Sequence, residues 1–251
     1  MLIGGYRIPI FASLIVWAVL WEIAGQLEVT ILLPPLSRVF VRMTEIVPTP
    51  SFLSALWTTA YAFVIGNLIA ITVGVPLGIV MGRSVLADRI FLPWVNLFLS
   101  APLTALVPVI MVLFGLGQTT IILTVVLFAI WIIVLDARAG VHSISPSLVE
   151  MAKSFGASPW QSFSRIYVWA ALPEILAGVR LGMIRAVKGV IIGQLLVSIV
   201  GFGALFKLYG SRFLMEHFWA ALLVLFAFAF LLAEGLARLE RRVDYYAASR
   251  T

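Results

Sequence analysis

Residues 145–173 read SPSLVEMAKSFGASPWQSFSRIYVWAALP, a polar stretch in a chain that is otherwise strongly apolar. This stretch predicts two short amphipathic helices joined by a sharp turn. Gly156 stands where the end of a helix favours a left-handed residue, and Ser158 with Gln161 has the spacing of a capping box that starts the second helix. Apolar residues share one face of each helix, namely Leu148, Met151, Ala152 and Phe155 on the first and Trp160, Phe163, Ile166, Tyr167 and Ala170 on the second.

The composition of the whole chain indicates a membrane protein. Of the 251 residues, 63% are hydrophobic and only 11% are charged, whereas a soluble domain carries about 25% charged residues. Apolar segments near the roughly 20 residues that a helix needs to cross a bilayer recur along the chain. We therefore expect an all-α membrane protein with six transmembrane helices, at residues 8–24, 55–81, 90–114, 119–135, 175–200 and 218–236.

The basic residues predict the orientation of these helices. If the helices alternate with the N-terminus inside, most cations fall on the side of residues 145–173, which the positive-inside rule makes cytoplasmic. We expect a multi-pass protein of the bacterial cytoplasmic (inner) membrane, with both termini in the cytoplasm. The net charge of +6 then reflects orientation in the lipid bilayer and does not indicate a nucleic-acid partner. The inner cations are Arg7, Arg83, Arg89, Arg138, Lys153, Arg165, Arg180, Arg238, Arg241, Arg242 and Arg250, and the outer ones are Arg38, Arg42, Lys207 and Arg212.

Residues 145–173 resemble the cytoplasmic "EAA" loop of the permease subunits of binding-protein-dependent ABC importers. The family pattern has Glu-Ala-Ala, then Gly and Ile at fixed distances, and Glu150, Gly156 and Ile166 keep that spacing. Met151 departs from the pattern because it replaces the middle alanine. A second departure is Val168-Trp169, where the family has Leu-Pro. The neighbouring sequences at 156–158 and 172–180 are most similar to the nitrate, sulfonate and taurine branch of the family.

This resemblance implies a type I ABC importer permease fold in one domain, residues 1–251. Residues 1–54 would form an N-terminal helix and an external loop, and 55–251 the permease core with its coupling loop at 141–172. The implied partners are a second copy of the chain, two ATP-binding-cassette ATPase subunits, and a periplasmic or lipid-anchored substrate-binding protein. A purely structural alternative is that Glu150 completes a capping box with Ser147. The residues implied to dock on the ATPase are Glu150, Met151, Ala152, Phe155, Gly156, Ala157, Ser158 and Trp160.

The sequence disfavours catalysis by this chain. It has no Gly-x-x-x-x-Gly-Lys-Ser/Thr phosphate loop, so ATP and Mg would be bound by the partner ATPase. Without cysteines, with two histidines and without an acid cluster at metal spacing, the chain is expected to hold no metal or cofactor. A stand-alone secondary transporter or channel for a small anion is the alternative function. That class, however, gives no reason for two capped amphipathic helices in the polar stretch.

Polar residues inside the predicted spans mark a candidate substrate pathway. Lys188 would lie near mid-bilayer, where a cation costs about 2.5–3.5 kcal/mol and should face a wet cavity or a partner. Such a charge suits a permease for small anions, although a helix that begins later would make the cation interfacial. The third span contains Pro93, Pro102 and Pro108, which predict a broken helix beside a pathway. The candidate pathway residues are Lys188, Arg185, Gln194, Asn96 and Ser100.

Further patterns predict how the helices pack and where the chain leaves the membrane. Pairs such as Gly74-x-x-x-Gly78 and Gly178-x-x-x-Gly182 predict close helix contact, within the chain or between copies. Residues 26–54 are expected to be external, with a helix beginning near Ser37. The stretch from 201 to 217 is expected to be a turn and an external loop.

Overall fold

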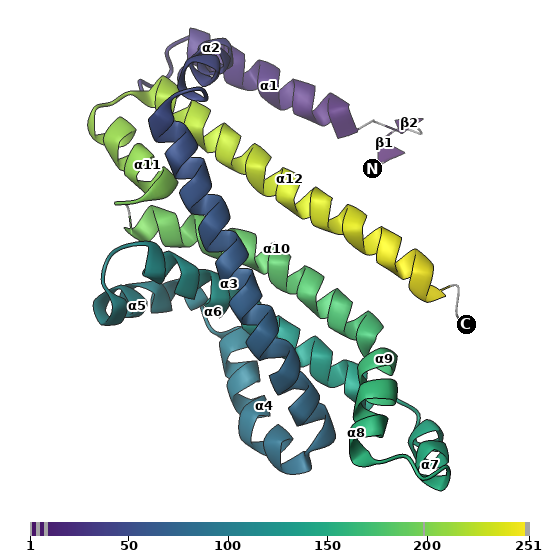
Figure 1. Ribbon diagram of the computed structural model, residues 1–251. Helices are drawn as coiled ribbons and strands as arrows, with labels where there is room; N and C mark the ends of the chain where they lie inside the picture. The colour runs from purple at the N-terminus through teal and green to yellow at the C-terminus, as the bar shows by residue number, and fades with distance from the viewer. Residues whose placement is uncertain (1, 4–5, 8–9, 198, 249–251) are drawn as a thin grey trace.

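The computed structural model describes residues 2–3, 6–7, 10–197 and 199–248, with side chains for 12–231 and 234–235 except 159, 164 and 198. Long helices dominate it (Figure 1). A short antiparallel pair, β1 (Leu2–Ile3) and β2 (Tyr6–Arg7), precedes them. The helices are α1 (Ile10–Gln26), α2 (Leu36–Ile46), α3 (Pro50–Arg83), α4 (Val85–Ser100), the 3₁₀ turn η1 (Leu103–Leu106), α5 (Val107–Phe114), α6 (Gln118–His142), α7 (Pro146–Ser154), α8 (Pro159–Ser162), the π-helix η2 (Phe163–Tyr167), α9 (Val168–Ala170), α10 (Leu172–Val197), α11 (Gly201–Ser211) and α12 (Met215–Ala248).

Helix α6 is the centre of the fold because α3 and α10 both pack along it. Their glycines face α6, and side chains there would not fit. A methyl group on Gly78 would lie 2.5 Å from the Val134 carbonyl oxygen, and one on Gly182 would lie 2.5 Å from Ile133 Cγ1. The glycine pairs therefore serve close packing within the chain, because without a Cβ the helix backbones approach each other.

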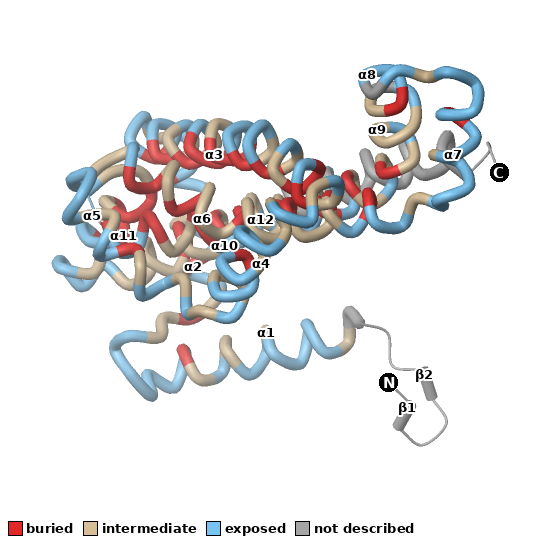
Figure 2. Tube along the Cα trace, turned by 90° about the horizontal axis from the view of Figure 1, so that it is seen from below, coloured by how far each residue is buried: buried red, intermediate tan, exposed pale blue. Residues whose placement is uncertain are grey.

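Buried side chains follow these contacts, as the red stretches of Figure 2 show. Ile121, Val125 and Ile133 of α6 are fully buried between α3 and α10. A second cluster joins α2, α3, α11 and α12 around residues that are all buried, namely Val39, Phe52, Phe202, Phe206, Ala221 and Leu225.

The expectation of an external loop at residues 201–217 is wrong for its first part, which forms α11. Phe202, Leu205, Phe206 and Tyr209 recur at helical spacing and are buried in the second cluster. The helix forms because this apolar face finds α2, α3 and α12 to cover it. The predicted helix near Ser37 is confirmed, since α2 begins at Leu36.

The break that the prolines predict in the third span is confirmed. Helix α4 and the helical segment 103–114 meet at an angle of 100°. Ala101 is extended there, as expected of a residue before proline, with φ −71° and ψ 148°. Pro93 lies inside α4 and does not end it, so the break falls at Pro102 alone.

Among the described helices, two are long and apolar enough to cross a membrane by themselves, α3 and α6. The number rises to four if α4 with 103–114, and α10 with α11, each count as one bent span. The apolar parts of α1 and α12 are shorter, at Ala12–Gln26 and Met215–Leu231. The predicted number of six therefore stays a prediction. The basic residues at position 7 and from 238 onward lie outside the described side chains.

Candidate functional site

Residues 145–171, here called the elbow, extend beyond the ends of α3 and α6 (Figures 1 and 2). Its first helix, α7, ends in a tight turn of the type that the sequence predicted. Gly156 N–H donates to the Lys153 carbonyl at 2.9 Å, and Ala157 N–H donates to the Ala152 carbonyl at 3.0 Å. Gly156 has a φ of 76°, a left-handed value that a glycine adopts without strain. The turn thus reverses the chain between two helices.

The second helix begins with the predicted capping box. The Ser158 hydroxyl accepts from Gln161 N–H at 3.2 Å, and the Gln161 side-chain oxygen accepts from Ser158 N–H at 2.8 Å. The alternative box between Ser147 and Glu150 does not form. The N-cap of α7 is Ser145, which makes no capping bond through its side chain. Glu150 is therefore not held in a capping role and lies exposed on α7.

The outward face of the elbow is apolar. Phe155 is 86% exposed and Trp160 is 71% exposed, while Leu148 and Met151 are also exposed. Ala152, which shares the predicted stripe, is buried instead, because it faces the rest of the elbow. Contiguous apolar side chains left uncovered on a surface mark a site of interaction with another molecule.

The elbow joins the bundle through small residues, and an ion pair near the end of α6 holds α4 there. A methyl group on Gly140 of α6 would lie 2.9 Å from the Ala171 carbonyl oxygen, so the two backbones nearly touch. Next to this contact, Arg138 of α6 donates from both Nε and Nη2 to the carboxylate of Asp88, with Nη2 to Oδ2 at 2.7 Å. The Asp88 contact ties the start of α4 to the end of α6.

The candidate pathway residues are not gathered into one site. Asn96 and Ser100 are exposed on α4, one turn apart, and Lys188 is exposed on α10 with Arg185 half-buried. Gln194 is fully buried, and its Nε2 donates to Thr59 Oγ1 at 2.7 Å, which links α10 to α3. Helix α4 packs on α3 and α6, and the pathway through these residues stays a prediction.

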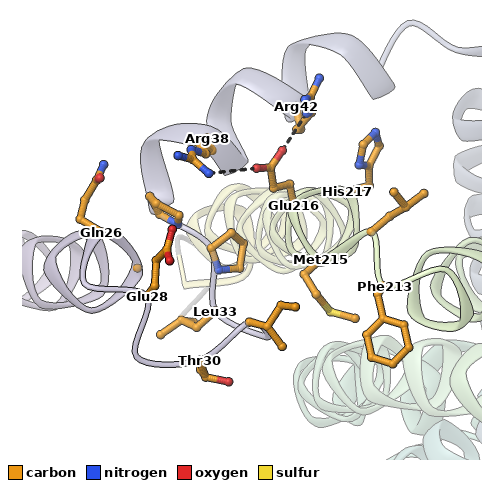
Figure 3. A pocket seen from close by; sticks show the side chains of 15 residues that line it. Gln26, Glu28, Thr30, Leu33, Arg38, Arg42, Phe213, Met215, Glu216 and His217 are labelled. Carbon is orange, nitrogen blue, oxygen red and sulfur yellow. Dashed lines mark hydrogen bonds and ion pairs between the residues drawn. The ribbon is translucent and has the colours of Figure 1, made fainter.

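At the opposite end from the elbow lies a cleft of about 590 Å³ that the sequence did not predict (Figure 3). Glu216 accepts a hydrogen bond from Arg42 Nε at 2.8 Å and lies 3.9 Å from Arg38. That hydrogen bond raises the pKa of Arg42 further above its ordinary value. Glu28 and Phe213, the non-glycine residues with left-handed φ among those described, both line the cleft. The pairing joins residues 174 positions apart, which no local pattern reveals.

No group of three or more histidine, cysteine or acidic side chains that could hold a metal occurs within the described part of the chain. Long apolar helices are typical of a helical membrane protein, and the elbow adds an exposed apolar face beyond the bundle.

Residues 74–245 match the family described as the binding-protein-dependent transport system inner membrane component, and the chain belongs to this family. It is thus an ABC importer permease, as the pattern of residues 145–173 implied.

Several curated relatives are similar to the chain. The taurine transport system permease protein TauC of Escherichia coli (strain K12) is 31% identical over 236 residues, which cover 92% of this chain and 85% of that protein. The glycine betaine/proline betaine transport system permease protein ProW of the same strain is 33% identical, over 54% of this chain and 38% of its own length. The riboflavin transport system permease protein RibX of Chloroflexus aurantiacus is 32% identical, over 55% of this chain and 54% of its own length.

A solved structure shares the fold. The inward-facing MetNI methionine ABC transporter aligns with a TM-score of 0.64 and 21% identity, over 77% of this chain and 96% of that chain. At this identity the likeness concerns the arrangement of helices alone.

Proposed function

We propose that this permease imports taurine or a similar small sulfonate, delivered by an extracytoplasmic binding protein and driven by two ATPase subunits that dock on the elbow. Two copies of the chain, each with six spans, form the pathway between them, and the termini and the elbow face the cytoplasm. The partner ATPases bind ATP and Mg and hydrolyse the nucleotide. Similarity to the taurine permease along most of both chains supports the substrate class.

The observation that carries this proposal is the apolar outer face of the elbow. Phe155 is 86% exposed although it belongs to a chain that buries other phenylalanines completely. Burial of such a ring stabilises a complex by roughly 1.5–3 kcal/mol, and the turn at Gly156 together with the Ser158 cap holds it in a fixed position. A preorganised apolar helix suits a hydrophobic groove on a soluble partner.

Coupling follows from this docking. When ATP draws the two ATPases together, they move the two elbows, and through α6 and α10 this displacement reaches the spans. Lys188, exposed on α10, would offset the charge of a sulfonate as it leaves water. Arg185, Asn96 and Ser100 would contribute further polar contacts along the pathway, and the buried Gln194 would enter it only after α10 and α3 separate.

Reconstitution tests the proposal directly. The permease, its ATPase subunit and its binding protein in proteoliposomes should accumulate labelled taurine only when ATP is supplied. Preferential uptake of glycine betaine or riboflavin would overturn the substrate. Uptake of taurine by the permease alone, without the ATPase, would overturn the importer and favour a secondary transporter.

Labelling tests the orientation separately. The chain has no cysteine, so single cysteines can be introduced at exposed positions on opposite ends of the bundle. Ser154→Cys in the elbow should react with an impermeant thiol reagent only in inverted membrane vesicles. Thr30→Cys, beside the Figure 3 cleft, should react only in intact spheroplasts. Labelling of Ser154→Cys from outside would overturn the cytoplasmic placement of the elbow.

A further inference from the structure

Arg83 is the last residue of α3, and its guanidinium lies against two aromatic rings of the elbow. Its Cζ is 5.3 Å from the ring centroid of Phe163 and 4.8 Å from that of Tyr167. A guanidinium at this distance is attracted to the face of each ring. None of the ion pairs within the described residues includes Arg83. Its contacts with the two rings therefore attach the end of α3 to the elbow.

The two rings lead to the exposed face of the elbow. They form the ends of the π-helix η2, and such short π-helical turns are frequent at functional sites. Phe163 contacts Trp160, with ring centroids 5.5 Å apart, and Trp160 is largely exposed. Aromatic contacts thus run without interruption from the surface that the ATPase would cover to the guanidinium of Arg83.

The other side of Arg83 is fixed to the bundle. A methyl group on Gly82 would lie 2.5 Å from Val141 Cβ, so the last turn of α3 is pressed against α6. Five residues after Arg83, Asp88 pairs with Arg138 of α6. The turn between α3 and α4 cannot shift without α6, because both of its ends are held there.

Free space lies beside the contact between Arg83 and the rings. A groove of about 460 Å³ separates the end of α3 from Phe163 and is lined by Pro76, Ile79, Val80, Arg83, Ser84 and Phe163. Phe163 and Tyr167 also pack against a cluster that includes Ile79 of α3 and Val141 of α6. Beside that cluster the groove leaves the elbow and α3 apart, and Arg83 reaches across it to the two rings. Pro76 removes one backbone donor within α3, so α3 can bend just before this groove.

We propose that Arg83 is a positioning residue that links the elbow to α3, so that displacement of the elbow moves α3 and α6 together. Without this link the elbow would swing into the groove, and ATP would be hydrolysed with little movement of the spans. The inference rests on the proposed docking of an ATPase on the elbow. It adds a specific residue that transmits the movement and that lies outside the elbow, at the end of α3.

The complete transporter in proteoliposomes provides the first test, with substrate transported per ATP hydrolysed as the readout. Arg83→Gln should keep its bound ATPase and lower this ratio about tenfold, a factor in the range that two cation–π contacts supply together. Arg83→Lys keeps a cation and should give an intermediate ratio. Arg89→Gln, a matched change at an exposed arginine on α4, should leave the ratio unchanged. A merely structural defect would reduce hydrolysis and transport by the same factor, so the ratio would not move.

A second measurement needs no transported substrate. Spin labels at Ser154→Cys in the elbow and Thr72→Cys on α3 report the distance between the two elements in a chain without other cysteines. Arg83→Gln should broaden this distance distribution, and Arg89→Gln should not. Equal widths in the two variants, or an unchanged transport ratio in Arg83→Gln, would overturn the role of Arg83. Failure of the unmutated chain to bind any ATPase would instead overturn the proposed function.

Discussion

The contact of α6 with α3 and α10 contrasts with the elbow, although both are helical and apolar. In the α6 contact, glycines bring backbones together and large side chains such as Ile133 and Val134 are fully buried. In the elbow, two helices are shaped by a turn and a cap, and Phe155 and Trp160 point away from the chain. In the first region, the apolar side chains are buried by other helices of the same chain. In the second, apolar side chains stay exposed, which indicates that a partner buries them.

The largest effect on stability should come from the α6 contact. Gly78→Ala places a methyl group 2.5 Å from the Val134 carbonyl oxygen, and such overpacking costs about 2 kcal/mol. Gly210→Ala is the matched control, because nothing lies within 4 Å of the added methyl there. Unfolding by denaturant in detergent measures the free energy of unfolding of both variants. Equal stabilities of the two variants would contradict the close contact of α3 with α6.

A smaller loss is expected where the two regions meet. Asp88→Asn removes the charge that accepts two hydrogen bonds from Arg138, and charge-assisted bonds of this kind contribute about 1.5 kcal/mol or more each when partly buried. Solvent screening at this partly exposed pair reduces the sum, so we expect a loss of about 1.5 kcal/mol. The double variant with Arg138→Gln should be little less stable than either single one, because the pair acts as a unit. Additive losses would show that the two residues act separately.

The smallest effect should be confined to the elbow. Gly156→Ala puts a side chain on a residue with a φ of 76°, where a methyl group meets nothing within 4 Å. The left-handed backbone then costs about 1 kcal/mol, and affinity for the ATPase should fall about fivefold while global stability stays unchanged. Gly156→Asn should lose less, because asparagine tolerates this conformation. Titration of the purified ATPase against the reconstituted permease measures the difference.

Much of this contrast could be predicted from the sequence because it depends on local signals. Apolar length predicts the long helices, glycine spacing predicts close packing, and the turn at Gly156 and the cap at Ser158 are set by residues within a few positions. The family pattern identified the elbow from Glu150, Gly156 and Ile166 alone.

The remaining features depend on residues that are distant in sequence. The burial of α11 and the pairing of Arg42 with Glu216 are decided by neighbours from other helices. The contact of Arg83 with Phe163 and Tyr167 is of the same kind. Gln194 is an example among the candidate pathway residues. Its polarity could be read from the sequence, but its hydrogen-bond partner, Thr59, lies 135 residues away and could not be predicted.

The most direct measurement of the central claim is the retention of the ATPase by two variants of the elbow. Phe155→Ser removes the most exposed ring of the elbow, and Lys153→Gln changes an exposed residue two positions earlier, in the last turn of α7. Each permease is co-expressed with its ATP-binding-cassette subunit and purified from membranes, and the bound ATPase is quantified. We predict that Phe155→Ser reaches the membrane in normal amount but loses its ATPase and its transport, whereas Lys153→Gln retains both. Full retention of the ATPase by Phe155→Ser would contradict the account.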